Sequence, residues 1–130
     1  MIKKLFFEIG GYFSDHHKIE IKGNKGLYNK TSSGPYFLNP EEFEIDSEKM
    51  EQLIQILNVI DVWSWEREYF NSEVMDGTHW QLEIVLLDGK RVKSEGSNKY
   101  PGSEGIEFSD KFLKLIRAFE LIGRIKISEI

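Results

Sequence analysis

The chain has 130 residues, of which 40% are hydrophobic, so we expect one domain over residues 1–130 with one core. It has no cysteine, which excludes disulfides, thiolate nucleophiles and cysteine-based zinc sites. Its 17 basic and 22 acidic residues give a net charge of −5. This balance disfavours broad nucleic-acid binding, because Lys and Arg must neutralise the phosphates.

The apolar segments of the chain are short. None approaches the roughly 20 residues that a membrane span needs. The opening residues resemble the start of a signal peptide, but Glu8 ends the apolar run well before the roughly 7–15 residues of a secretory segment. We therefore expect a cytoplasmic protein that does not bind membranes.

Two strands and a turn are predicted at the start of the chain. Residues 2–9 and 12–22 alternate apolar and polar side chains, and Gly10-Gly11 between them is typical of a turn. After a second turn at 23–26, a short third strand at 27–29 is compatible with the pattern. The Ser-, Gly- and Pro-rich residues 30–40 predict a loop.

A helix is predicted next, over about residues 47–60. Apolar residues recur there at helical spacing, and Asp46 or Ser47 can cap the first turn by accepting from an exposed backbone N–H. Residues 61–69 form an aromatic connector, and residues 71–77 are polar and turn-like.

A second hairpin and a final helix complete the pattern. In the strand at 78–87, the probable core face carries Trp80, Leu82, Ile84 and Leu86. Asp88-Gly89 is a strong hairpin signal because both turn positions tolerate positive φ, and residues 90–96 form the return strand. A loop at 96–102 precedes a helix at about 109–122, for which Ser109 is a plausible cap.

The order of elements is therefore strand, strand, optional short strand, helix, strand, strand, helix. Hairpins separated by helices indicate an α+β fold. We expect an antiparallel β-sheet built from hairpins, with two helices packed on one face.

The histidines are the first candidates for chemistry. Asp15, His16 and His17 could suggest a metal site, but adjacent residues of a strand point to opposite faces, so no metal site is predicted. His79 and Glu83 share a strand face, yet lie about 13 Å apart at roughly 3.3 Å per residue, which is too far for an acid–base hydrogen bond. An exposed histidine is the favoured interpretation of His79.

No sequence motif of a known catalytic site is present. The chain has no Gly-x-Ser-x-Gly elbow, no Walker loop and no Gly-x-Gly-x-x-Gly after a strand. The many acidic residues are expected to be solvated charges. We predict no catalytic residue and no cofactor, and the chain is more consistent with a non-enzyme.

Aromatic residues around the connector are the best remaining lead. Trp and Tyr give large contact areas with a polar tip, and they are enriched at binding hot spots. Trp65, Tyr69 and Tyr100 could therefore line a groove. The alternative is a core role, which we favour for Trp63 and Trp80.

A combined motif links these residues. Trp63 and Tyr69 precede Asp76-Gly77-Thr78-x-Trp80-x-Leu82-x-Ile84, and Gly96-Ser97-Asn98-x-Tyr100-Pro101 follows. Over about residues 53–122 the chain resembles a group of small, uncharacterised bacterial proteins with DGTxWxLxI followed by GSNxYP. The resemblance implies no activity. It makes a shared site plausible where the Asp76 turn meets the Asn98 loop, at the open end of the hairpin.

That open end is the predicted binding patch. Its residues are Trp65, Tyr69, Asp76, His79, Asn98 and Tyr100. The alternative is structural, because Asp76 and Asn98 can staple the end of the hairpin through backbone hydrogen bonds.

The leading functional hypothesis is a non-enzymatic interaction module with a protein partner, such as an inhibitor or immunity-type protein. The alternatives are a small enzyme that uses His79 with a nearby carboxylate, and a structural homo-oligomer subunit. The sequence leaves the oligomeric state open.

Overall fold

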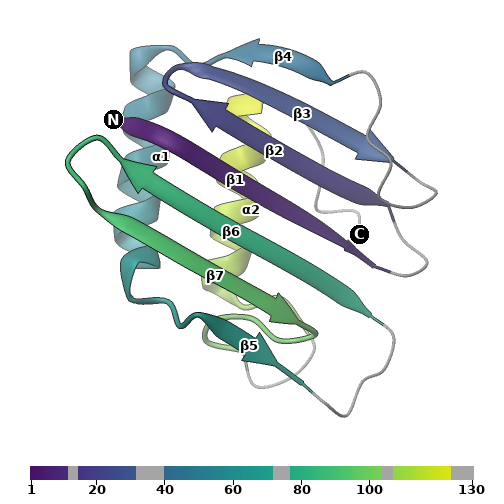
Figure 1. Ribbon diagram of the computed structural model, residues 1–130. Coiled ribbons are helices and arrows are strands. Elements are labelled where there is room, and N and C mark those ends of the chain that lie inside the picture. The colour runs from purple at the N-terminus through teal and green to yellow at the C-terminus, as the bar shows by residue number, and fades with distance from the viewer. Residues whose placement is uncertain (12–14, 32–39, 72–76, 104–106, 124–130) are drawn as a thin grey trace.

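The structure is a computed structural model of the chain and describes residues 1–11, 15–31, 40–71, 77–103 and 107–123. Within these ranges seven strands form one sheet, and two helices cover one of its faces (Figure 1). This arrangement confirms the predicted α+β architecture.

The elements follow one another in a simple order along the chain. They are β1 (Ile2–Gly11), β2 (His16–Lys22), β3 (Lys25–Thr31), β4 (Glu41–Glu44), α1 (Ser47–Val59), the 3-10 helix η1 (Val62–Ser64), β5 (Glu68–Phe70), β6 (Thr78–Leu86), β7 (Arg91–Ser97) and α2 (Asp110–Gly123). The sheet order is β4-β3-β2-β1-β6-β7-β5. All neighbours pair antiparallel except β5 and β7, which are parallel.

The N-terminal half has the predicted strands and one more, but the predicted turn at Gly10-Gly11 is wrong, because both glycines belong to β1 and pair with β6. β1 and β2 form the first hairpin, and the optional third strand is β3, which is longer than expected. Residues 30 and 31 of the predicted loop belong to β3, and 32–39 lie outside the described residues. β4 was not predicted, since its sequence Glu-Glu-Phe-Glu carries little strand preference.

Both helices begin at the predicted caps. The Asp46 side chain accepts a hydrogen bond from the backbone N–H of Lys49 at 2.8 Å, and Glu48 lies in the first turn, where the helix dipole favours an anion. The Ser109 hydroxyl accepts from the N–H of Phe112 at 3.2 Å.

The second hairpin closes at the predicted residues, although of Asp88 and Gly89 only Gly89 has a positive φ. Gly89 has φ +97°, which a glycine adopts at little cost, and the Asp88 carboxylate accepts from the N–H of Lys90 at 2.9 Å. The predicted core face of β6 is buried throughout. Period-two alternation therefore fixes which side of this hairpin meets the helices.

The core lies between the sheet and the two helices. Phe7 of β1 packs against Phe119 and Phe112 of α2, with ring centroids 5.0 and 6.1 Å apart. α1 adds Met50, Leu53 and Leu57. Full burial of one such side chain stabilises the fold by about 1.5–3 kcal/mol.

β5 is a further strand that the sequence did not indicate, inside the predicted connector. It spans three residues and runs parallel to β7. The Ser94 hydroxyl donates to the carbonyl of Glu66 at 2.7 Å, and the N–H of Glu95 donates to the carbonyl of Arg67 at 3.0 Å. These bonds hold the connector against β7. The two edges of the sheet are therefore β4 and β5, with four and three residues.

Among the described residues, neither helix combines the length and the apolar character that crossing a membrane requires.

Candidate functional site

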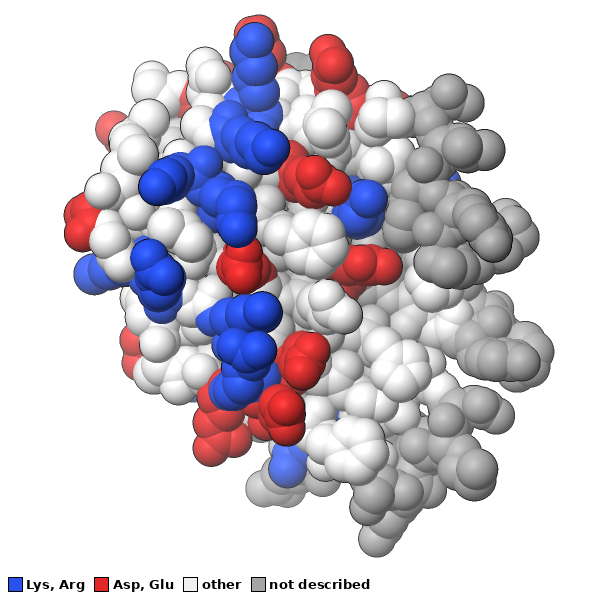
Figure 2. All heavy atoms as spheres, viewed as in Figure 1, with Lys and Arg blue, Asp and Glu red and all other residues white. Residues whose placement is uncertain are grey.

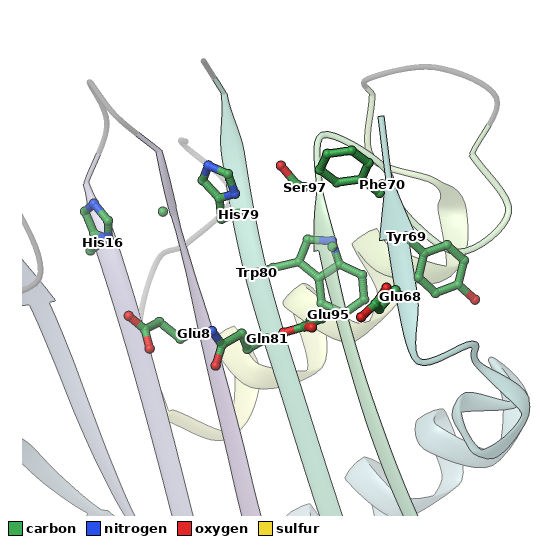
Figure 3. Close-up of a pocket in the computed structure, with 12 residues that line it drawn as sticks. Glu8, His16, Glu68, Tyr69, Phe70, His79, Trp80, Gln81, Glu95 and Ser97 are labelled. Atoms are coloured by element: carbon green, nitrogen blue, oxygen red, sulfur yellow. The ribbon is translucent and has the colours of Figure 1, made fainter. Parts of the chain in front are cut away.

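The helices leave one face of the sheet uncovered by described elements, and we call it the open face (Figure 1). A pocket of about 380 Å³ lies on it, over β1, β6, β7 and β5. We call it the open-face pocket. Figure 3 shows that its polar side chains come from neighbouring strands and form two rows across the sheet.

The first row is acidic. Strand register places Glu8 opposite Gln81, Gln81 opposite Glu95, and Glu95 beside Glu68. Neighbouring strands lie about 4.8 Å apart, so the backbones of Glu8 and Glu95 are separated by roughly 10 Å with Gln81 between them. Four side chains from four strands therefore form one line (Figure 3).

The second row carries two histidines and an aromatic ring. His79 pairs with Gly10 on one side and with Ser97 on the other. A side chain on Gly10 would overlap the ring of His16, so the missing Cβ lets this imidazole lie across β1. At the far end is Phe70, which is 68% exposed.

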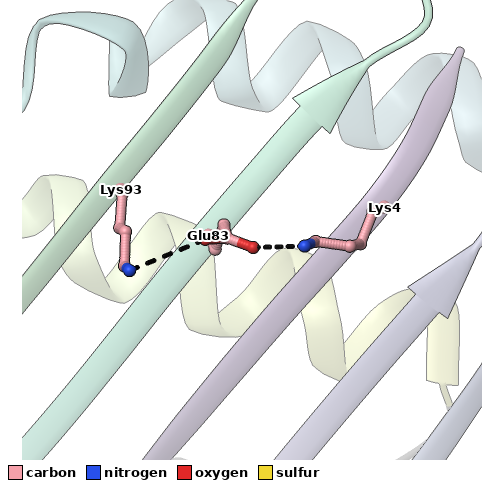
Figure 4. Close-up of polar contacts among 3 residues, drawn as sticks. All are labelled: Lys4, Glu83 and Lys93. Atoms are coloured by element: carbon pink, nitrogen blue, oxygen red, sulfur yellow. Dashed lines mark ion pairs between the residues drawn. The ribbon is translucent and has the colours of Figure 1, made fainter.

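The three carboxylates of the pocket differ from others on the same face. Glu83 contacts Lys4 at 2.6 Å and Lys93 at 4.0 Å (Figure 4). The hydrogen bond from Lys4, helped by the charges of Lys4 and Lys93, holds the pKa of Glu83 below its ordinary value. Within the described part of the chain, the pocket carboxylates Glu8, Glu68 and Glu95 make no ion pair, although Lys18 lies opposite Glu8 in β2.

Charge is graded along the open face. Lys4, Lys22, Lys25 and Arg91 come together by register at the end where β1 begins. Figure 2 shows the Lys and Arg side chains as a band on that side. The open-face pocket lies at the other end, so an approaching molecule meets a basic and an acidic region on one surface.

The structure distributes the six residues of the predicted patch among different environments. Tyr69 and His79 line the open-face pocket, and His79 is exposed. The His79 side chain makes no hydrogen bond or ion pair within the described ranges. Asp76 lies outside the described residues.

Trp65 and Tyr100 belong to the core, with 7% and 2% of their surfaces exposed. The Trp65 ring stacks on Phe112 at 6.4 Å, and the Tyr100 ring lies 4.6 Å from Phe112. Burial raises the pKa of the Tyr100 hydroxyl. Both rings therefore face α2, and they are not available as contact area on the surface.

Asn98 closes the open end of the β6–β7 hairpin. Its backbone has φ +57°, its side-chain oxygen accepts from the N–H of Thr78 at 2.8 Å, and its N–H donates to the carbonyl of Thr78 at 2.9 Å. A side chain on Gly77 would overlap the Asn98 amide. This geometry matches the alternative in which Asn98 has a structural role and staples the end of the hairpin. Its partner in both hydrogen bonds is the backbone of Thr78.

His16 and His17 lie on opposite faces of β2, as alternation requires. The His17 ring is 3% exposed, and its Nδ1 lies 2.7 Å from the hydroxyl of Tyr28. Burial, reinforced by Lys30, lowers the pKa of His17, although Asp15 and Glu120 oppose the shift. Burial, with smaller contributions from nearby carboxylates, raises the pKa of Tyr28 to about 12.

The buried His17 predicts acid sensitivity. Its pKa in the folded chain is below the unfolded value near 6.5, so below that pH the unfolded chain binds the proton more readily. The free energy of unfolding is expected to fall as pH drops below about 6.5 until the folded pKa is reached, by at most about 1.4 kcal/mol per pH unit. Urea unfolding between pH 7.5 and 5 measures this.

His17→Gln should remove this part of the pH dependence. His79→Gln, which replaces an exposed histidine, is the matched control and should retain it. An unchanged slope for His17→Gln would contradict the assignment.

Most of the pocket was missed by sequence reasoning. Alternation in the first strand does place Glu8 on a polar face, and the same holds for Gln81. Glu8 and Gln81 become neighbours only because β1 pairs with β6. These two strands are separated in the chain by a helix, so no local sequence signal indicates that they pair. Glu68 and Phe70 come from β5, whose three residues are too few for a periodic pattern.

In the part of the chain that the structure describes, no three acidic or histidine side chains are arranged to hold a metal ion. A scan of protein-family models and a search of curated proteins find no match for this chain. Any assignment of function therefore depends on the geometry of the open face.

Proposed function

We propose that this chain is a non-enzymatic protein-binding module that holds a basic partner against the open face of its sheet, as an inhibitor or immunity-type protein would. The observation that carries this proposal is the open-face pocket, where Glu8, Glu68 and Glu95 gather and make no ion pair with a described residue, although Lys18 lies opposite Glu8 in the neighbouring strand. These glutamates are exposed or half-buried, so water can solvate them, and three of them on one surface favour a cationic partner through charge complementarity.

The overall charge supports the same partner. A net charge of −5 attracts a basic protein over a distance of about one Debye length, which is close to 8 Å at physiological salt. The bacterial cytoplasm, expected from the sequence and its resemblance, is where we expect the two proteins to meet.

An acid–base enzyme is less well supported. That hypothesis needs His79 within hydrogen-bond reach of a carboxylate. Within the described ranges His79 has no such bond, and Glu83 on the same strand is engaged by Lys4 and Lys93. We therefore keep His79 as a pocket-lining residue and assign it no catalytic role.

A charge reversal tests the proposed function. Glu95→Lys places a cation in the middle of the acidic row, and like charge should repel the basic partner. We expect recovery of the partner from lysate of the source cell to fall by about tenfold or more, measured by quantitative affinity capture.

Glu51→Lys is the matched control for that capture. Glu51 is an exposed residue of α1, on the covered side of the sheet, and its reversal makes the same change in net charge. Recovery should match the unmodified chain. Equal losses for both variants, or no loss for Glu95→Lys, would count against the open face as the interface.

A further inference from the structure

Exposed hydrophobic side chains meet at the end of the sheet where β1 begins and the β6–β7 turn lies (Figure 1). Met1 and Leu87 are 63% and 67% exposed, and the N–H of Leu87 donates to the carbonyl of Met1 at 2.9 Å, so the two residues are neighbours. We call this pair the apolar tip. The Lys90 ammonium of the same turn lies 5.9 Å from the ring centroid of the partly buried Trp63.

A row of cations borders the apolar tip. Strand register places its members in one line across β3, β2, β1 and β7, with Val85 of β6 within the line. All of these cationic side chains are exposed, and Figure 2 shows them on one side of the open face. We call this row the basic band, and it consists of Lys4, Lys22, Lys25 and Arg91.

This end of the molecule carries an excess of positive charge. The basic band, Lys3 and the β6–β7 turn together hold six cations. Two carboxylates lie among them, Glu44 opposite Lys25 and Asp88 in the turn, which leaves a difference of four positive charges. In the row behind the band, salt bridges engage two further carboxylates, which are Glu20 with Lys18 and Glu83 with Lys4.

We infer that this end of the chain docks on an anionic bilayer surface. In this arrangement the side chains of the apolar tip enter the headgroup layer, and the basic band faces the lipid phosphates. A bilayer satisfies both features together, whereas an acidic protein would engage the band alone. The inference goes beyond the proposed function and does not depend on it.

The sequence led us to expect no membrane binding, because it has no long apolar segment. That argument concerns a membrane span, and the apolar tip has a different origin. Met1 and Leu87 are far apart in the chain and become neighbours only through the pairing of β1 with β6. A surface of this kind has no signal in a single stretch of sequence.

The net charge of −5 does not prevent such docking, because the charges are separated along the strands. Glu8 of the acidic row lies four residues beyond Lys4 in β1, which is about 13 Å at roughly 3.3 Å per residue. The Debye length at physiological salt is close to 8 Å, so salt screens the acidic row from the bilayer. The open-face pocket would then be directed away from the lipid.

Flotation of the complete chain with lipid vesicles tests the inference. One vesicle type contains phosphatidylcholine and phosphatidylglycerol in equal parts, and the other contains phosphatidylcholine alone. We expect saturable binding to the anionic vesicles at low salt, and binding at least about tenfold weaker to the neutral ones. Added salt should release the bound chain, because it screens the attraction.

A first pair of variants tests the basic band. Lys22→Gln combined with Lys25→Gln should weaken binding by about 25-fold, since each cation near an anionic surface contributes about fivefold. Lys111→Gln combined with Lys114→Gln makes the same change in net charge on exposed residues of α2, and should leave binding unchanged.

A second pair tests the apolar tip. Leu87→Ser should weaken binding by about tenfold, which is at the lower end of the effect of burying a leucine fully. Leu121→Ser is the matched control, because Leu121 is 58% exposed on α2, and it should bind as the unmodified chain does. All substituted side chains are exposed, and circular dichroism checks that each variant folds.

Three results would each overturn the inference. They are absence of binding to the anionic vesicles at low salt, equal binding to both vesicle types, and equal losses for the variants and their α2 controls. Absence of binding would leave an acidic protein as the occupant of the basic band. None of these results bears on the basic partner, which Glu95→Lys tests separately.

Discussion

Replacement of Trp80 by alanine is expected to lower the free energy of unfolding by about 3–5 kcal/mol, the range for deleting a fully buried large aromatic side chain. Trp80 is 1% exposed, and its ring lies 5.0 Å from Phe112 and 6.0 Å from Tyr69. Its Nε1–H also donates to the carbonyl of Lys99 at 3.0 Å. The substitution therefore opens a cavity and leaves this carbonyl without its donor.

Chemical denaturation of the unmodified chain and of the Trp80→Ala variant measures this difference in the free energy of unfolding. Trp63→Ala is the control, since Trp63 is only partly buried and its Nε1–H bonds to the Asn58 side chain at 2.9 Å. It should cost about 1 kcal/mol. Similar losses for the two variants would show that Trp80 is not the centre of the aromatic core.

The second large effect is expected at Asn98, where alanine should cost about 2–4 kcal/mol. Alanine removes the acceptor of the Thr78 N–H, worth about 1–3 kcal/mol for a group left unpaired. Alanine also adopts the left-handed backbone conformation at φ +57° less readily than asparagine does, which adds about 1 kcal/mol to the loss of stability. Thermal and urea unfolding should report a loss of this size.

Two further substitutions at Asn98 divide that loss. Glycine adopts the left-handed conformation easily but supplies no acceptor, so Asn98→Gly should recover only the backbone part. Aspartate keeps an acceptor oxygen and should be the mildest change. Lys99→Ala, at an exposed neighbouring position, is the control. If Asn98→Ala lowers the free energy of unfolding by less than Lys99→Ala does, the structural role of Asn98 is contradicted.

The hairpin of β6 and β7 was predictable because its signals are local. The alternation of Trp80, Leu82 and Ile84 has the period of a strand, and Asp88-Gly89 supplies the turn chemistry within two residues. The helices were predictable for the same reason, since caps and apolar spacing both lie within the segment. Such elements need no knowledge of what they pack against.

The edge strands and the sheet order were not predictable in this way. β5 exists because its three residues pair with residues of β7 that lie 27 positions later in the chain, as Glu68 pairs with Glu95. β4 is mostly acidic and forms by pairing with β3. In both cases tertiary pairing overrides weak local preference.

The aromatic patch illustrates a second limit. Tryptophan and tyrosine serve equally well in a binding hot spot and in a core, so composition could not separate the two for Trp65 and Tyr100. The residue that places both rings in the core is Phe112 of α2, which packs against Trp65 and Tyr100. The pocket, in contrast, is made of residues that looked like ordinary solvated charges until strand register placed them in one row.

The outermost strands have a consequence for how copies of the chain behave at high concentration. The strand β4 spans only four residues, three of which are glutamates, and β5 spans three. A fibril would need to stack such borders repeatedly, and each added layer would bring carboxylates into register with their own kind. Short and negatively charged margins thus guard against polymerisation, while the broad surface between them stays open to other proteins.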